Sequence, residues 1–196
     1  MLRPRLITPP ATRLLSLADA KLHLRVDGTA DDGLIDGYVL AAEGHLDGHS
    51  GIMGRALITQ TWRAEWANWP AYYLALPFPD VQSVAVQYYD ADNVLRTLAA
   101  ERYRLIEGAR GSMLEWDDSF ASPSLYSRSD AIRVDMVCGY GDAASDVPAD
   151  IIHAVKLLIG AWYENRENNV IGATTLDLPS SVNLDGLLFK HRRVGL

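Results

Sequence analysis

The chain has 196 residues, a formal net charge of −7 at pH 7 and 22% charged side chains. This length suits one domain with room for a sizeable insertion, and it is long enough to bury a hydrophobic core. The acidic balance argues against tight nonspecific binding of nucleic acid, because such binding depends on Lys and Arg side chains that neutralise phosphates. A single cysteine, Cys138, excludes an internal disulfide and fits a reducing compartment.

Neither the first residues nor any later stretch predicts a targeting or membrane segment. Residues 1–10 lack the apolar run of a signal peptide. No stretch approaches the ~18 uninterrupted apolar residues that indicate a transmembrane helix. We therefore expect a protein that is made and used in the cytoplasm, or carried in a particle assembled there, with no membrane partner.

The first block of the chain, residues 1–56, is predicted to be helical. Ser16 followed by Asp19 has the form of a capping box, so a short helix should begin there and end near Arg25. In a second helix, each glycine costs roughly 1 kcal/mol relative to alanine, so packing against a partner is expected to hold this helix. The apolar face of that second helix is formed by residues spaced four apart, with two more apolar residues alongside them, namely Leu34, Tyr38, Ala42 and Leu46 with Ile35 and Val39.

Between residues 57 and 143 the period of the apolar pattern changes to two, which is typical of strands. Turn-forming residues at 90–93 and 108–111 indicate two hairpins. We expect one antiparallel sheet that curls on itself. The predicted strands cover residues 61–66, 72–76, 84–89, 94–98, 103–106, 112–116 and 132–138.

The last block, residues 144–196, returns to a helical pattern. Pro148 fits the first turn of a helix, where its missing N–H does no harm. Burial of each large apolar side chain contributes ~1.5–3 kcal/mol, so this helix is predicted to be the best core element and to contact neighbours on two sides. A final helix is expected to end at Lys190, before the basic tail at 191–193. The apolar residues of the longer helix are Ile151, Ile152, Val155, Leu158, Ile159, Trp162 and Tyr163.

These three blocks predict an α+β fold. The helical blocks, 1–56 and 144–196, should pack together as a helical bundle-like core. The block 57–143 should form an antiparallel β-rich subdomain inserted into that core.

Few residue patterns indicate catalysis or metal binding. His45 and His49 are four residues apart, a spacing with which two imidazoles on one helix face can bind a metal ion. Asp47 lies between them but is expected to point away from that face, and the glutamate of a metalloprotease helix is missing. We favour a solvated helix end over a hydrolase or metal enzyme, and we expect no catalytic activity, no metal and no cofactor.

Aromatic residues crowd the first predicted strands. Exposed aromatic rings can stack on bases or sugars, so Trp66, Trp69 and Tyr72 offer an alternative function as a β-domain binding module for carbohydrate or single-stranded nucleic acid. The alternation of the pattern places several of these rings on one face of the sheet. The favoured interpretation is therefore a sheet core.

Residues 161–168, with the sequence AWYENREN, combine aromatic, acidic, amide and guanidinium groups. Glu164 and Glu167 lie three apart on one helix face, but a carboxylate-bridged di-metal site would require Glu-x-x-His instead. No nucleophile or base accompanies them in the sequence. The segment indicates an anchored helix end that changes from core contacts to polar contacts.

Four segments occur in an order that points to a known family. They are SLADAKLHLRV at 16–26, GRALITQTW at 54–62, GYGD at 139–142 with VP at 147–148, and AWYENRE at 161–167. Together they resemble the head–tail connector proteins (adaptor or head-completion proteins) of long-tailed bacteriophages and prophages. The resemblance covers about residues 7–195. The inserted residues 51–53 and the closing helix and tail depart from the family pattern.

The resemblance implies a non-enzymatic structural protein of the virion, assembled in the host cytoplasm and located at the head–tail junction. Such proteins form a ring under the portal protein and give a docking surface to the next tail component, a stopper or a tail terminator. Helices would form the ring and the β-rich insertion would decorate it, with a dodecamer expected after assembly, a monomer in isolation, and DNA passing through without specific binding. The suspected structural and interface residues are Leu34, Tyr38, Leu46, Ile151, Val155, Leu158, Trp162, Tyr163, Glu164, Arg166, Arg192 and Arg193.

Overall fold

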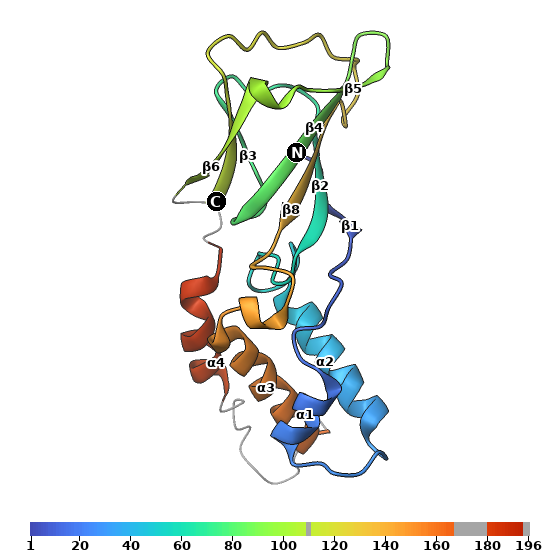
Figure 1. The fold of residues 1–196 in the computed structure, drawn as a ribbon, viewed down its shortest axis with the longest axis vertical. Helices are drawn as coiled ribbons and strands as arrows, with labels where there is room; N and C mark the ends of the chain where they lie inside the picture. The colour runs from blue at the N-terminus through green and yellow to red at the C-terminus, as the bar shows by residue number, and fades with distance from the viewer. Residues whose placement is uncertain (109–110, 167–179, 194–196) are drawn as a thin grey trace. The chain divides into compact units, whose positions relative to one another are not determined.

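A computed structural model describes residues 1–108, 111–166 and 180–193 (Figure 1). It contains helices and two antiparallel sheets, so the predicted α+β class is confirmed. Of the helices among the described residues, none combines the length and the apolar character needed to cross a membrane.

The chain divides into two compact units. We call them the β unit and the helical unit. The N-terminal residues group with the strands, because Arg5–Thr8 pairs with a strand from later in the chain. The β unit consists of residues 1–11 and 59–140 together with Arg193, and the helical unit consists of the described residues within 12–58 and 141–192.

Local sequence signals define the helices of the helical unit. The Ser16 hydroxyl accepts a hydrogen bond from the Asp19 backbone N–H at 3.0 Å, as predicted for the first helix. At the other end of that helix Arg25 adopts a left-handed conformation and its N–H bonds the carbonyl of Leu22. The α-helices are α1 (Leu17–Leu24), α2 (Asp32–Leu46), α3 (Ala149–Glu164) and α4 (Ser180–Leu188), and two short 3₁₀ turns cover Ala144–Asp146 and Phe189–His191.

The core of the helical unit lies between α2 and α3, and α1 and α4 also pack on α3 (Figure 1). On α2 only half of the predicted row is buried, namely Ala42 and Leu46. Leu34 is 37% exposed and Tyr38 is half-buried, whereas Ile35 and Val39 are fully buried. Both of these pairs, 34/38 and 35/39, are apolar in the sequence, which did not show which pair faces α3. The buried residues of the two helices are Ile35, Val39, Ala42, Leu46, Ile151, Ala154, Val155, Leu158 and Ile159.

The β unit contains two sheets rather than the single curled sheet predicted from sequence. The first sheet has the strand order β1-β2-β8-β4-β5, and the second has the order β3-β7-β6. The segment between β2 and β4 leaves the first sheet and pairs with β7, and prolines at 70, 77 and 79 flank that segment. The strands are β1 (Arg5–Thr8), β2 (Gln60–Trp66), β3 (Tyr73–Ala75), β4 (Val81–Tyr89), β5 (Leu95–Thr97), β6 (Tyr103–Gly108), β7 (Gly111–Trp116) and β8 (Ile132–Cys138), with a 3₁₀ turn at Ala100–Arg102.

The two faces of the five-stranded sheet differ in chemistry. One face is apolar and buried, with Ala64 of β2 and Val134 of β8 directly paired. The opposite face carries charged side chains, because successive residues of a strand point to opposite sides. The strand register pairs Arg63 with Asp135 and Glu65 with Arg133 on that face.

Candidate functional site

The C-terminal end of α3, at residues 161–166, binds the residue that precedes α2. The Tyr163 hydroxyl donates a hydrogen bond to Asp31 at 2.7 Å, and this bond is the first cause of the raised pKa of Tyr163. The guanidinium of Arg166 lies 3.5 Å from the same carboxylate and 4.9 Å from the Tyr163 ring centroid. Glu164 is exposed, and Glu167 lies outside the described residues. The cluster is an anchor, as the sequence indicated.

Beside this anchor lies a partly exposed apolar surface. The rings of Tyr38 and Trp162 are 6.2 Å apart at an angle of 53°. Leu34 lies one turn before Tyr38 on the same side of α2. Leu34 is exposed, and Tyr38 and Trp162 are half-buried. We call these three residues the aromatic patch.

Four of the suspected structural and interface residues have a structural place inside the helical unit. Leu46, Ile151, Val155 and Leu158 are buried within the helical unit. They fill the space between α2, α3 and their neighbours in a single chain, so they cannot also contact a neighbouring copy while the unit stays folded. They form the core of the unit.

The basic residues near the C-terminus are tied to other parts of the chain. Arg192 pairs with Asp185 at 2.5 Å. Arg193 donates hydrogen bonds to the carbonyls of Pro77 and Leu76, and burial lowers the pKa of its guanidinium. Both suspected interface arginines therefore already have partners within the chain.

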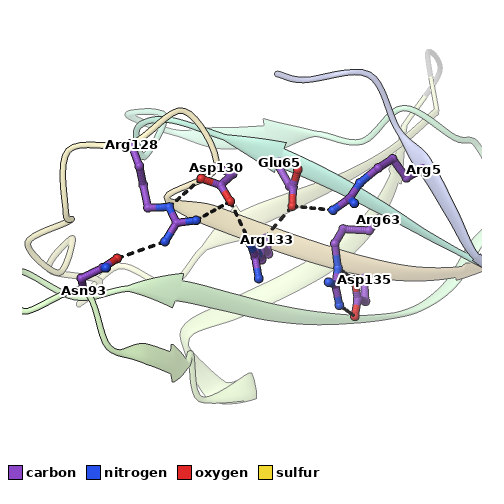
Figure 2. A network of polar contacts seen from close by, with 8 residues as sticks. All are labelled: Arg5, Arg63, Glu65, Asn93, Arg128, Asp130, Arg133 and Asp135. Atoms are coloured by element: carbon purple, nitrogen blue, oxygen red, sulfur yellow. Dashed lines mark hydrogen bonds and ion pairs between the residues drawn. The ribbon is translucent and has the colours of Figure 1, made fainter.

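A chain of ion pairs crosses the charged face of the five-stranded sheet (Figure 2). Glu65 lies at its centre, 3.0 Å from Arg5 and 3.3 Å from Arg133. Arg133 continues to Asp130 at 2.8 Å, and Arg128 holds Asp130 with two bonds of 2.6 and 2.7 Å. The two-pronged geometry of such arginine–carboxylate pairs fixes orientation as well as charge.

Two further contacts extend this network. Arg63 and Asp135 form a second two-pronged pair at 2.6 and 2.7 Å (Figure 2). The guanidinium of Arg128 lies 3.7 Å from the centroid of the Tyr89 ring. The bond from Arg128 is the main reason why the pKa of Asp130 is far below its usual value. The network was not predicted from the sequence, although the alternating charges of Arg63-x-Glu65 and Arg133-x-Asp135 indicate it.

The aromatic residues of the β unit mostly pack inside it. The Trp69 ring lies 5.4 Å from Trp116 and 5.5 Å from Phe120, and its indole N–H donates to the carbonyl of Pro123. Trp66 is half-buried, whereas Tyr72 is 83% exposed. A stacking platform made of Trp66, Trp69 and Tyr72 is therefore not supported, because Trp69 is already packed by other rings.

The possible metal ligands at the end of α2 do not form a cluster. His45 is exposed, and Asp47 accepts a hydrogen bond from the Leu57 N–H at 2.7 Å. That bond holds the loop after α2. Within the described residues, no three side chains of His, Cys, Asp or Glu come together as the ligands of a metal ion would.

The fold is shared by chains in several solved structures. No family model matches the sequence, and no curated protein matches it. Solved structures do match over the whole chain. A chain from the neck of an empty gene transfer agent (GTA) particle, computed with C6 symmetry, is 25% identical with a TM-score of 0.78, over 100% of this chain and 97% of that chain.

Two further structures give the same result. A chain in the virion of a native GTA particle is 23% identical with a TM-score of 0.74, and one in the neck of a native GTA particle, computed with C12 symmetry, is 22% identical with a TM-score of 0.69. Each covers 100% of this chain and 97% of its own. The resemblance to head–tail connector proteins is thereby confirmed.

Proposed function

We propose that this chain is a structural protein of the head–tail junction, which completes the head and gives the tail its docking surface. The observation that carries this proposal is the match of the entire chain, in both units, to a chain from the neck of a GTA particle. The protein acts by assembly and not by catalysis. Its place of action is the virion, after assembly in the host cytoplasm.

The proposed assembly is a ring of identical copies between the portal protein and a tail-side stopper or terminator. The C6 and C12 symmetries of the similar necks support a cyclic arrangement, and a dodecamer fits the second of them. A cyclic ring uses two different surfaces of each copy, which meet head to tail. An acidic chain suits a conduit for DNA, because phosphates are repelled and not held.

Within the helical unit, the aromatic patch is the proposed contact with the neighbouring copy. The apolar rows of α2 and α3 are buried within the chain, so they cannot contact a neighbouring copy. Tyr and Trp are enriched at the centres of protein interfaces, where they bury a large area with few rotatable bonds. Leu34, Tyr38 and Trp162 provide such a surface, and exposed Glu164 and Arg166 lie next to Trp162 in the chain.

The test of the function is to mix the purified chain with its portal protein and to image the complex by electron microscopy. The expected result is an added ring of density on the portal. A portal that remains without such a ring at saturating chain concentration would refute the proposal.

The test of the contact surface uses two exposed leucines on the same helix. Leu34→Glu should prevent ring formation on the portal without unfolding the chain, because a carboxylate would be buried in the contact. Leu40→Glu is the matched control, since Leu40 is 52% exposed and lies about 120° around α2 from Leu34. Loss of the ring with Leu40→Glu but not with Leu34→Glu would assign the contact to the Leu40 side of α2.

A further inference from the structure

The five-stranded sheet ends in two strands that each have one partner within the described residues. β1 pairs with β2, and β5 pairs with β4. Every residue of both strands is exposed. An edge strand presents a row of backbone N–H and C=O groups that another chain can pair with. The sheet therefore offers two edges for strand addition.

Both edges also expose aliphatic side chains. Leu6 and Ile7 on β1, and Val94 and Leu95 at β5, have exposed fractions between 41% and 45%. Isolated exposed aliphatic residues are common, but here they coincide with the two strand edges. Covering them would add apolar burial to the backbone hydrogen bonds.

The charges at the two edges differ. Residues 1–11 contain Arg3 and Arg5 and no acidic residue. The turn that leads into β5 contains Asp90 and Asp92. Asp90 is held by Arg96, whereas Asp92 is exposed at the tip of the hairpin. The β1 edge is thus basic, whereas the β5 edge combines Arg96 with an acidic turn, so Asp92 at the tip of that turn favours contact with the basic edge of the next copy.

Strand directions fit a head-to-tail arrangement. The pairs β1–β2, β2–β8, β8–β4 and β4–β5 are all antiparallel, so β1 and β5 run in the same direction. In copies related by rotation about an axis along the strands, β5 of one copy would meet β1 of the next as a parallel pair. A contact between unlike surfaces of this kind can close into a ring.

We propose that the β1 edge of one copy binds the β5 edge of the next, so that the sheets of neighbouring copies join. This inference rests on the proposed ring and adds a second contact to it, beside the aromatic patch. Each pairing is weak, because β5 has three residues and β1 has a bulge after Leu6 and prolines at 4, 9 and 10. The contact is therefore formed in the ring and not by dilute chains.

The experiment places one cysteine on each edge. In the Ile7→Cys/Leu95→Cys variant, an internal disulfide is impossible, because four strand spacings separate the edges by about 19 Å and bridged Cα atoms lie within about 7 Å. Cys138 is buried and does not take part. Mild oxidation of the concentrated chain, and of the chain bound to its portal, should give a reducible ladder of dimers, trimers and higher species.

Three controls make the result decisive. Each single variant should stay monomeric after oxidation, since its cysteine has no partner. Ser83→Cys/Leu95→Cys, with the first cysteine exposed on interior strand β4, should give no ladder. A double variant that behaves like the single variants in both arms overturns the inference, as do dimers of Ile7→Cys alone. If the ring forms on the portal without the crosslink, this inference fails while the proposed function stands.

Discussion

Removing the charge of Glu65 tests whether the ion-pair network stabilises the β unit. The side chain of Glu65 is 8% exposed and bridges Arg5 and Arg133 (Figure 2). The Arg5 side chain is 59% exposed, whereas that of Arg133 is 19% exposed. Water therefore screens the Glu65–Arg5 pair more strongly than the Glu65–Arg133 pair.

The expected magnitude follows from this difference. Breaking a fully buried pair costs about 3–5 kcal/mol, and an exposed pair contributes about 0–1 kcal/mol. Arg133 keeps Asp130 as a partner when Glu65 is changed, which reduces the loss. We expect Glu65→Gln to lower the free energy of unfolding of the β unit by about 1–3 kcal/mol. Most of this loss should come from the interaction of Glu65 with Arg133.

The measurement is a pair of double-mutant cycles by urea unfolding, Glu65→Gln with Arg133→Gln and Glu65→Gln with Arg5→Gln. Tryptophan fluorescence follows the β unit, because Trp62, Trp66, Trp69 and Trp116 lie in it. The midpoint should shift at unchanged m-value. A coupling to Arg5 as large as the coupling to Arg133, or a wild-type midpoint for Glu65→Gln, would refute the reasoning.

Three other predictions concern single positions. Ile151→Ala should destabilise the helical unit of the full chain by about 2–5 kcal/mol in thermal or urea unfolding, because the side chain is fully buried; a wild-type stability combined with lost assembly would instead indicate that Ile151 lies in the interface. Gly37→Ala should raise the stability of α2 by about 0.5–1 kcal/mol, because an added Cβ would have no atom within 4 Å; a loss of stability in the same assay contradicts this. Because the pKa of Asp130 is lower in the folded chain than in the unfolded chain, its ionised carboxylate stabilises the fold. This stabilisation is complete above about pH 3.9, the pKa of Asp in an unfolded chain, and is lost as the pH falls further. The urea midpoint of the β unit should therefore fall on acidification below about pH 4, less steeply in Asp130→Asn, and equal slopes would contradict the assignment.

Local signals in the sequence were sufficient for most of the helices and strands. The capping box at Ser16 and the alternation that produced β8 were both correct, since each depends on neighbours along the chain. Pairing depends on distant residues. The split into two sheets, the strand at Arg5–Thr8 and the register that joins Glu65 to Arg133 were therefore not predicted. The same limit explains α2, where Ile35 and Val39 are buried in place of Leu34 and Tyr38 although both pairs are apolar.

The placement of the apolar stripes changes how the proposed ring must be held together. The broadly apolar sequence of α3 suggested that one side of the helix contacts a neighbouring copy. Its large aliphatic side chains are instead buried within one chain. What remains for a neighbour is a half-buried aromatic patch, polar residues beside it and two short strand edges. Interfaces of this composition resemble those of partners that are also stable apart, whereas permanent oligomers bury a more apolar core. A chain built in this way should fold as a monomer and join its neighbours when the portal brings them close, because the binding of each copy then becomes effectively intramolecular.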